Sequence, residues 1–174
     1  MQINVSQLLR EPVGSIRDYQ VNEVADIEGY GKDSPVQGDV RLLRIQRSIL
    51  AKCALSTEVE LTCSRCLSTF RYPLTLDFEE EYLPTIDVLS GVPLPRPEEA
   101  GAFTIDEHHI LDLTEAICQY TLLAIPMKPL CHIDCAGLCP NCGHNLNQGR
   151  CDCSEQSTDP RWSELMKLLS HQAK

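Results

Sequence analysis

Eight of the ten cysteines stand in four short pairs, and this pattern constrains the chain more than any other feature. Within each pair only one to three residues separate the cysteines, so a tight turn can point both sulfur atoms at one ion. Zinc takes four thiolate or imidazole ligands at the corners of a tetrahedron, and two such pairs therefore complete one site. The pairs are Cys63 with Cys66, Cys131 with Cys135, Cys139 with Cys142, and Cys151 with Cys153.

The redox environment decides whether such pairs bind metal or form disulfides. Residues 1–10 have neither the basic segment nor the apolar run of a secretion signal. No apolar stretch approaches the roughly 18 residues that a membrane span requires. The sequence therefore predicts a cytoplasmic protein that contacts no membrane. Thiols stay reduced in that compartment, and the cysteine pairs are interpreted as metal ligands rather than disulfides.

The spacing of the pairs predicts two zinc ions and favours one way of sharing them. The knuckle-like run from Cys139 to Gly143 lies only eight residues before Cys151, so the last two pairs are expected to form one local site. By elimination, the first two pairs form a second site that joins distant parts of the chain. Two alternatives stay open: Cys131, Cys135, Cys139 and Cys142 could share an ion, and His132 or His144 could replace a thiolate, although both histidines are better explained as exposed loop residues.

Both predicted zinc ions are interpreted as structural. Eight thiolates close two coordination shells and leave no position for a reacting water molecule. The two remaining cysteines, Cys53 and Cys118, lie within the apolar patterns of a strand and a helix. They are therefore predicted to be core residues.

Catalytic alternatives find little support in the sequence. The C-x-x-C of Cys63 and Cys66 lies between two strand patterns, whereas a thioredoxin-like motif opens a helix. A zinc deaminase needs a P-C-x-x-C motif, which is absent. The neighbouring His108 and His109 border an acidic loop and are interpreted as solvated surface. No phosphate-binding glycine loop or nucleophile elbow occurs, so no enzyme activity and no small-molecule substrate are predicted.

The formal charge of −10 is unevenly distributed. Residues 77–115 hold eleven acidic side chains and one basic one, whereas residues 41–71 hold six basic and two acidic ones. Such a balance argues against non-specific binding to nucleic acid. The basic segment could still contact RNA, although a solvated strand surface is the simpler interpretation.

Hydrophobic periodicity outlines the secondary structure. Apolar residues at every second position predict a long hairpin over residues 47–82, with Cys63 and Cys66 at its turn. The polar stretch from Tyr19 to Gln37 is expected to be a connection. A helix is predicted from Asp112, which with Glu115 fits a capping box, to about residue 124 before Pro126. Asp159 followed by Pro160 predicts the start of a terminal helix.

These elements predict an α+β fold: an antiparallel sheet or partial barrel with one central helix, a cysteine-rich zinc-binding tail and a C-terminal helix. The expected body covers residues 1–130 and includes a mobile, proline-rich loop at 84–102. The zinc-binding tail and the terminal helix are expected over residues 131–174. The sequence leaves the oligomeric state open.

Several of these motifs together resemble one family. Cys63-Ser-Arg-Cys66-Leu67 resembles the C-x-R-C-L signature of the YceD family, the large ribosomal RNA subunit accumulation proteins. The run from Ile125 to Cys131, the cysteine-rich run from Cys135 to Asn147 and the ending at Asp159-Pro160-Arg161 are also similar to bacterial members of that family.

The resemblance implies a cytoplasmic factor needed for normal accumulation of large-subunit ribosomal RNA. It also implies a genomic association with a large-subunit ribosomal protein, and it brings no established catalytic residues. Some members keep the hairpin pair and ligands near positions 131 and 135 but lack most tail cysteines, which supports the favoured sharing of zinc. The expected function is therefore ribosome assembly through binding of pre-ribosomal RNA or a ribosomal protein. The alternatives are a zinc- or thiol-dependent enzyme and a zinc-stabilised adaptor without a ribosomal role.

Overall fold

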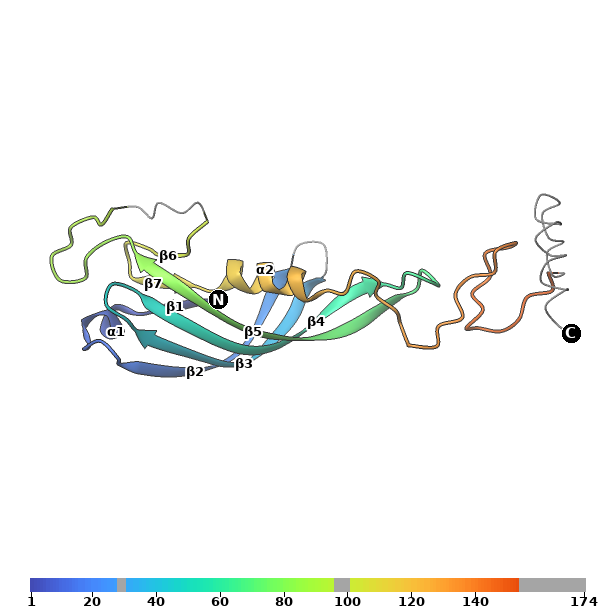
Figure 1. Cartoon of the computed structure of the whole chain (residues 1–174), viewed down its shortest axis with the longest axis horizontal. Coiled ribbons are helices and arrows are strands. Elements are labelled where there is room, and N and C mark those ends of the chain that lie inside the picture. Colours follow the sequence, from blue (N-terminus) through green and yellow to red (C-terminus); the bar gives the residue numbers. More distant parts are fainter. Residues whose placement is uncertain (28–30, 96–100, 154–174) are drawn as a thin grey trace, which may run out of the picture.

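The computed structural model describes residues 1–27, 31–95 and 101–153, and its main feature is one seven-stranded sheet curled into half a barrel (Figure 1). The strands lie in the order β1-β7-β6-β5-β4-β3-β2, and every pair is antiparallel except β5 with β6. This architecture confirms the predicted fold class. The elements are β1 (Gln2–Asn4), α1 (Ser6–Arg10), β2 (Ile16–Ile27), β3 (Gly31–Arg44), β4 (Ile49–Thr62), β5 (Thr69–Pro84), β6 (Thr104–Ile105), β7 (Ile110–Asp112) and α2 (Thr114–Ala124).

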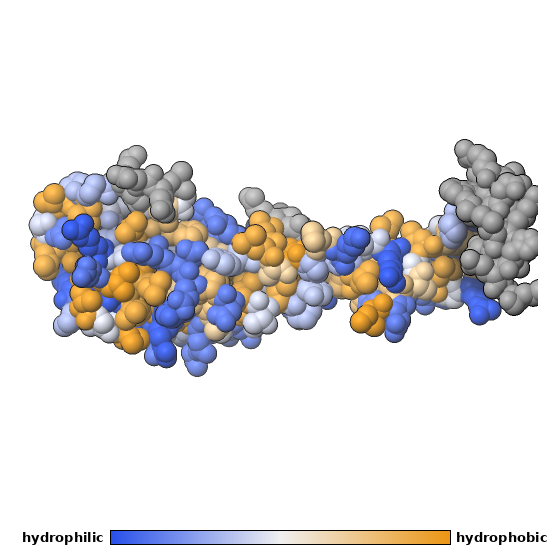
Figure 2. Space-filling view, in the orientation of Figure 1, coloured by the Kyte–Doolittle hydropathy of each residue, from blue (hydrophilic) through white to orange (hydrophobic). Residues whose placement is uncertain are grey.

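Strands β4 and β5 form the long hairpin that the period-two pattern predicts. Burial alternates residue by residue along β4, because one face of the sheet packs on the core and the other meets solvent. The register sets Cys53 opposite Phe78 and Leu55 opposite Leu76, all of them buried. The hairpin extends beyond the half-barrel, so its turn lies well away from the core, on a narrow extension that the space-filling view also shows (Figure 1 and Figure 2).

The segment from Tyr19 to Gln37 is not the connection that its polar side chains and Pro35 predicted. It belongs to a second long hairpin, in which β2 pairs with β3 from Ile16 opposite Leu43 to Ile27 opposite Gly31. The strand pattern is weak because the solvent face of β2 mixes polar side chains with exposed Ile16 and Val24, and its inner face is only partly buried. Pro35 is accommodated within β3, opposite Val24.

Helix α2 packs on the inner face of the half-barrel and completes its core (Figure 1). Ala116 and Ile117 are fully buried, and the Tyr120 ring stacks on Phe78 with 4.3 Å between centroids. The Tyr120 hydroxyl donates a hydrogen bond of 2.6 Å to the Glu80 carboxylate. The helix ends at Ala124, directly before the segment that contains Pro126, as predicted.

The start of α2 differs from the predicted capping box. Asp112 belongs to β7, Leu113 is the N-cap residue, and no side chain caps the helix. The Asp112 carboxylate instead accepts the Thr114 N–H at 2.9 Å and the Gln2 side-chain amide at 3.0 Å. Burial opposes ionisation of Asp112, but these donors outweigh it and lower the pKa to about 2. The residue therefore ties β1 to the start of α2 rather than capping the helix.

The loop predicted at 84–102 is described in part, and the predicted terminal helix is not. Within the predicted loop at 84–102, the described part forms a turn in which the Asp87 carboxylate accepts the N–H groups of Leu89 and Ser90. The terminal helix predicted from Asp159 lies outside the described residues. The division at residue 130 stays a prediction. No helix in the described part of the chain is long and apolar enough to cross a membrane.

Truncating the buried face of α2 tests this packing. Ile117→Ala is expected to lower the free energy of unfolding by about 2–4 kcal/mol, because it leaves a cavity between the helix and the sheet. Leu123 lies on the same helix but is 78% exposed, so Leu123→Ala is the matched control and should change stability by less than about 0.5 kcal/mol. Urea unfolding followed by circular dichroism measures both. Equal losses in the two variants would mean that α2 does not pack as described.

Candidate metal centres

The first four-cysteine cluster joins the turn of the β4–β5 hairpin to the chain that follows α2. The Sγ atoms of Cys63, Cys66, Cys131 and Cys135 all lie within 4.8 Å of one another. The Cys63–Cys135 distance is 3.7 Å and the Cys66–Cys131 distance is 3.6 Å. Cys63, Cys66 and Cys135 are buried. Residues 65 to 72 positions apart in the sequence thus share one small volume.

Backbone hydrogen bonds shape this cluster. The Cys63 carbonyl accepts the Leu67 N–H at 3.0 Å, which closes the turn, and Leu67 takes a left-handed φ of 57°. The Ser64 N–H donates to the Pro129 carbonyl at 2.8 Å. The Arg65 guanidinium donates to the Cys135 carbonyl at 3.0 Å. The hairpin turn is therefore joined to the chain that follows α2 by hydrogen bonds as well as by contacts between thiols.

The second cluster is local in sequence, as the short spacing predicts. The Sγ atoms of Cys139, Cys142, Cys151 and Cys153 also lie within 4.8 Å of one another. The Cys139 carbonyl accepts the Gly143 N–H at 2.9 Å, and Gly143 has a φ of +72° that favours glycine. Cys139 is buried, whereas Cys142 and Cys153 are exposed. This site is thus more open to solvent than the first.

Two asparagines connect the clusters, and the sequence patterns did not single them out. The Asn147 amide donates to the Cys135 Sγ at 3.3 Å, while its carbonyl oxygen accepts the Ala136 N–H at 2.8 Å. The Asn145 amide donates to the Ser68 hydroxyl of the hairpin turn at 3.0 Å. Both residues lie in the turn-rich segment between Cys142 and Cys151. Their spacing two residues apart is the one signal in the sequence, and it does not specify a role.

The electrostatics of both clusters favour a bound cation. The Cys63 thiol is buried, but N–H groups of Cys66, Cys131 and Arg65 face its sulfur and lower its pKa to about 5. The N–H groups of Cys142 and Asn141 lower the pKa of Cys139 to about 6. Burial and neighbouring sulfurs raise the pKa of Cys131 to about 12. The Cys142 sulfur and burial likewise raise the pKa of Cys153 to about 12. The first proton leaves each cluster readily, while full ionisation needs a compensating positive charge.

The donor set fits a soft metal ion such as zinc. Four sulfur atoms at about 2.3 Å from a tetrahedral ion stand about 3.8 Å apart, close to the distances in the first cluster. Soft thiolate ligands select zinc, copper(I) or iron–sulfur clusters, while magnesium and calcium prefer oxygen. Each cluster can therefore hold one ion, and the identity of that ion is a prediction.

The structure groups the eight thiols as the favoured spacing predicts, and not in the alternative that joins Cys131, Cys135, Cys139 and Cys142. His132 and His144 are exposed, although the His132 Nδ1 lies 3.1 Å from the Cys131 Sγ. Cys53 is buried as expected, and burial raises its pKa to about 12. Cys118 is half-buried, with its Sγ 3.7 Å from the Asp26 carbonyl, and so lies at the margin of the core rather than within it.

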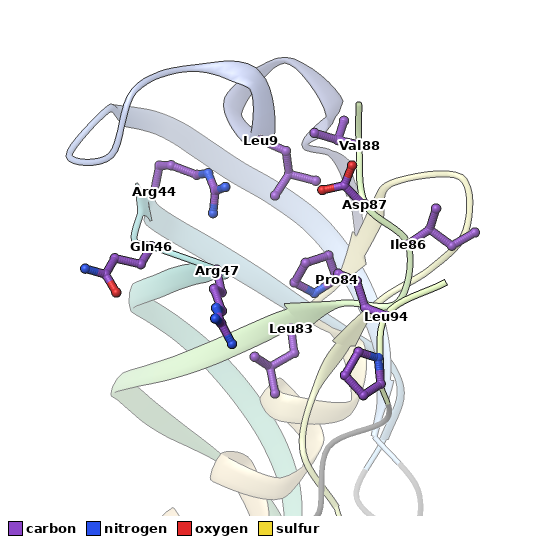
Figure 3. A pocket seen from close by; sticks show the side chains of 11 residues that line it. Leu9, Arg44, Gln46, Arg47, Leu83, Pro84, Ile86, Asp87, Val88 and Leu94 are labelled. Atoms are coloured by element: carbon purple, nitrogen blue, oxygen red, sulfur yellow. The ribbon is translucent and has the colours of Figure 1, made fainter. Parts of the chain in front are cut away.

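A pocket of about 620 Å³ lies at the other end of the half-barrel, where α1, the turn after β3 and the chain after β5 meet (Figure 3). Leu9 and Leu83 contribute apolar walls, and the side chains of Arg44 and Arg47 extend toward it (Figure 3). Its lining residues include no cysteine and no histidine. The pocket is therefore separate from the chemistry of the thiol clusters.

The basic segment over residues 41–71 does not form a free cationic face. Arg41 pairs with Asp18 at 2.7 Å and Lys52 with Glu79 at 2.7 Å, each across neighbouring strands. Arg71 lies 3.8 Å from Glu58. The guanidinium of Arg44 donates to the carbonyls of Ile45 and Ser48. Three of the six basic residues in this segment, Arg41, Lys52 and Arg71, are thus matched by acidic side chains within the protein.

Comparison with known proteins points to one family. The family described as large ribosomal RNA subunit accumulation protein YceD matches residues 51–169. A protein of Mycobacterium tuberculosis and one of Mycobacterium bovis are each 28% identical over 138 residues, which is 75% of this chain and 60% of theirs. A protein of Arabidopsis thaliana named large ribosomal RNA subunit accumulation protein YCED homolog 1, chloroplastic, is 26% identical over 168 residues, which is 82% of this chain and 51% of that protein.

The chain therefore spans between about half and 60% of the length of these relatives. No solved structure matches it significantly.

Proposed function

The chain belongs to the YceD family of large ribosomal RNA subunit accumulation proteins, and from that premise we propose that it supports large-subunit assembly by binding a basic ribosomal protein. The family description names an effect on ribosomal RNA and no reaction. The proposed role is that of a zinc-stabilised binding protein. We expect it to act where ribosomes assemble, in the cytoplasm.

The charge pattern on the outer face of the sheet is the observation that carries this proposal. Asp18, Arg41, Lys52 and Glu79 form one row across β2, β3, β4 and β5, and their charges cancel. The next row holds Asp39 and Asp77 on either side of Ala54. Neither carboxylate has an ion pair within the described ranges, and both are exposed. The face therefore offers negative charge to a partner.

A basic protein fits this face better than RNA does. Ribosomal proteins carry lysine- and arginine-rich surfaces that bind RNA, and an acidic face can engage them before assembly. RNA binding needs several unmatched cations that neutralise phosphates. The rows on the sheet supply carboxylates instead, and the overall charge of −10 becomes more negative when zinc binds eight thiolates.

The proposed zinc ions have a structural part in this function. Cys63, Cys66, Cys131 and Cys135 would hold the first ion, and the other four thiols the second. Zinc supplies the positive charge that lets all eight thiols ionise together. Four thiolates per ion leave no open coordination position, which supports a structural role over a catalytic one.

Charge reversal separates a protein partner from an RNA partner. Asp39→Lys with Asp77→Lys is expected to reduce co-sedimentation with precursor large-subunit particles at least tenfold at physiological salt, because it places cations against a basic partner. Arg47→Glu is the matched control, since Arg47 is exposed and has no ion pair in the described part of the chain. Reversal of Arg41 or Arg44 is unsuitable, because both hold local structure.

Two results would contradict the proposal. Loss of co-sedimentation in Arg47→Glu, with the acidic variant unaffected, would point to RNA phosphates as the target. Absence of ribosomal components from the sediment of the wild-type protein would favour an adaptor without a ribosomal role. Thermal unfolding of each variant confirms that the sheet remains folded.

A further inference from the structure

Strand β2 is the last strand of the sheet, and its outer edge has no strand partner among the described residues. The Ser15 carbonyl accepts the Arg44 N–H at 2.8 Å, which fixes the hydrogen-bonding phase between β2 and β3. Peptide groups alternate in direction along an antiparallel strand. The backbone N–H and C=O groups of the even-numbered residues from Ile16 to Val24 therefore point away from β3, toward the open edge.

This edge is unusually complementary to itself. If β2 is laid antiparallel against a second β2 with Gln20 opposite Gln20, Ile16 meets Val24 on both sides of the centre. Arg17, which already pairs with Glu11 in its own chain, meets Glu23 of the second copy. Ile16 is 54% exposed and Val24 is 62% exposed, which is unusual for large apolar residues on a strand. Apolar pairs and opposite charges in direct register each stabilise an antiparallel pair.

The same register also lets the outward-pointing backbone groups of the two strands form hydrogen bonds with each other. Pairing about Gln20 places even-numbered residues opposite even-numbered residues, so the outward-pointing N–H and C=O groups of the two strands meet. A shift by one residue would set outward groups against inward ones and would separate the apolar and charged pairs. Natural proteins protect exposed strand edges, because such edges recruit other strands. Here the edge carries complementary rather than repulsive groups.

We propose that β2 is a homodimer interface, in which two copies of the chain join edge to edge about Gln20 and form one continuous sheet. A two-fold axis through this point makes each contact occur twice, as in most homodimers. The partner is a second copy because the register pairs Ile16 with Val24 and Arg17 with Glu23 of the same sequence. The interface leaves the face that carries Asp39 and Asp77 exposed, so it does not depend on the proposed function.

A charge-pair experiment on the full-length zinc-loaded chain tests the register. Sedimentation velocity across a wide concentration range should show a monomer–dimer equilibrium for the wild-type protein. Ile16→Lys with Val24→Lys places two lysine pairs across the interface and should weaken the dimer at least tenfold. Ile16→Glu with Val24→Glu should do the same. An equimolar mixture of the two variants should recover the dimer as a heterodimer, because each lysine then faces a glutamate.

Leu89 is exposed on the loop after β5, so Leu89→Lys should leave the equilibrium unchanged. A wild-type protein that stays monomeric at every concentration would overturn the proposal. A dimer that persists in both charge variants, or a mixture that fails to recover it, would show that β2 does not pair in this register. Circular dichroism confirms that all variants keep the sheet.

Discussion

Removing zinc with a strong chelator is expected to unfold the cysteine-rich region over residues 131–153 while the half-barrel stays folded. This region has few buried side chains besides Cys135 and Cys139, so packing alone contributes little to its stability. Structural zinc in small peptides supplies roughly 10–16 kcal/mol of apparent binding free energy, and that energy becomes folding energy. Amide hydrogen exchange should therefore show full loss of protection in the tail and unchanged protection in β3, β4 and β5.

Single substitutions separate the two clusters. Cys63→Ser removes a wholly buried candidate ligand, and we expect loss of one zinc ion and release of the tail from the hairpin turn. Cys142→Ser alters only the second cluster and should leave the contact between Ser64 and Pro129 protected. Cys118→Ser is the control, because this residue lies outside both clusters. Retention of two zinc ions by Cys63→Ser would contradict the proposed first site.

Replacing Gly38 by alanine is expected to destabilise the half-barrel by about 3–5 kcal/mol, since it combines backbone strain with a steric clash. Gly38 lies within β3 at a φ of +147°, which side chains of L-residues rarely allow. An added Cβ would overlap the carbonyl oxygen of Ala54 and lie 2.9 Å from the Leu55 Cα. Both obstacles are backbone atoms of β4, so no side-chain rotation can relieve them.

A second glycine provides the comparison. Gly91 also has a positive φ, +68°, but an added Cβ there meets nothing within 4 Å. Gly91→Ala should therefore cost only about 1 kcal/mol, from backbone strain alone. Guanidinium unfolding of the two variants measures the difference. A Gly38→Ala protein as stable as Gly91→Ala would mean that β3 and β4 do not approach as closely as described.

The sequence predicted those parts of the fold in which the hydrophobic pattern is strong. Strands β4 and β5 alternate clearly because one face is wholly buried, and α2 presents Ala116 and Ile117 on one face. Strand β2 escaped prediction because solvent reaches both of its faces along much of its length. The position of Gly38 also gave no signal, since its role depends on how closely β4 approaches.

The second candidate metal centre was predictable because its information is local, and the first followed from it by elimination. Short spacing within each pair indicates which two thiols can bind the same ion, and the eight-residue link to Cys151 favours the local site. The contribution of Asn145 and Asn147 was not predictable, because it depends on how the tail folds back on the hairpin turn. The matching of Arg41 and Lys52 by acids on neighbouring strands likewise requires the sheet register, which charge counting along the chain cannot supply.

Metal stoichiometry combined with X-ray absorption spectroscopy at the zinc edge tests the central claim most directly. Protein purified without chelator should contain two zinc ions per chain, each with four sulfur neighbours at about 2.3 Å and no oxygen or nitrogen ligand. Two of the ten thiols, those of Cys53 and Cys118, should lie outside the metal shells. One zinc ion per chain, or a first shell that includes a water oxygen, would contradict the account and would return the unclaimed thiols as redox or catalytic candidates.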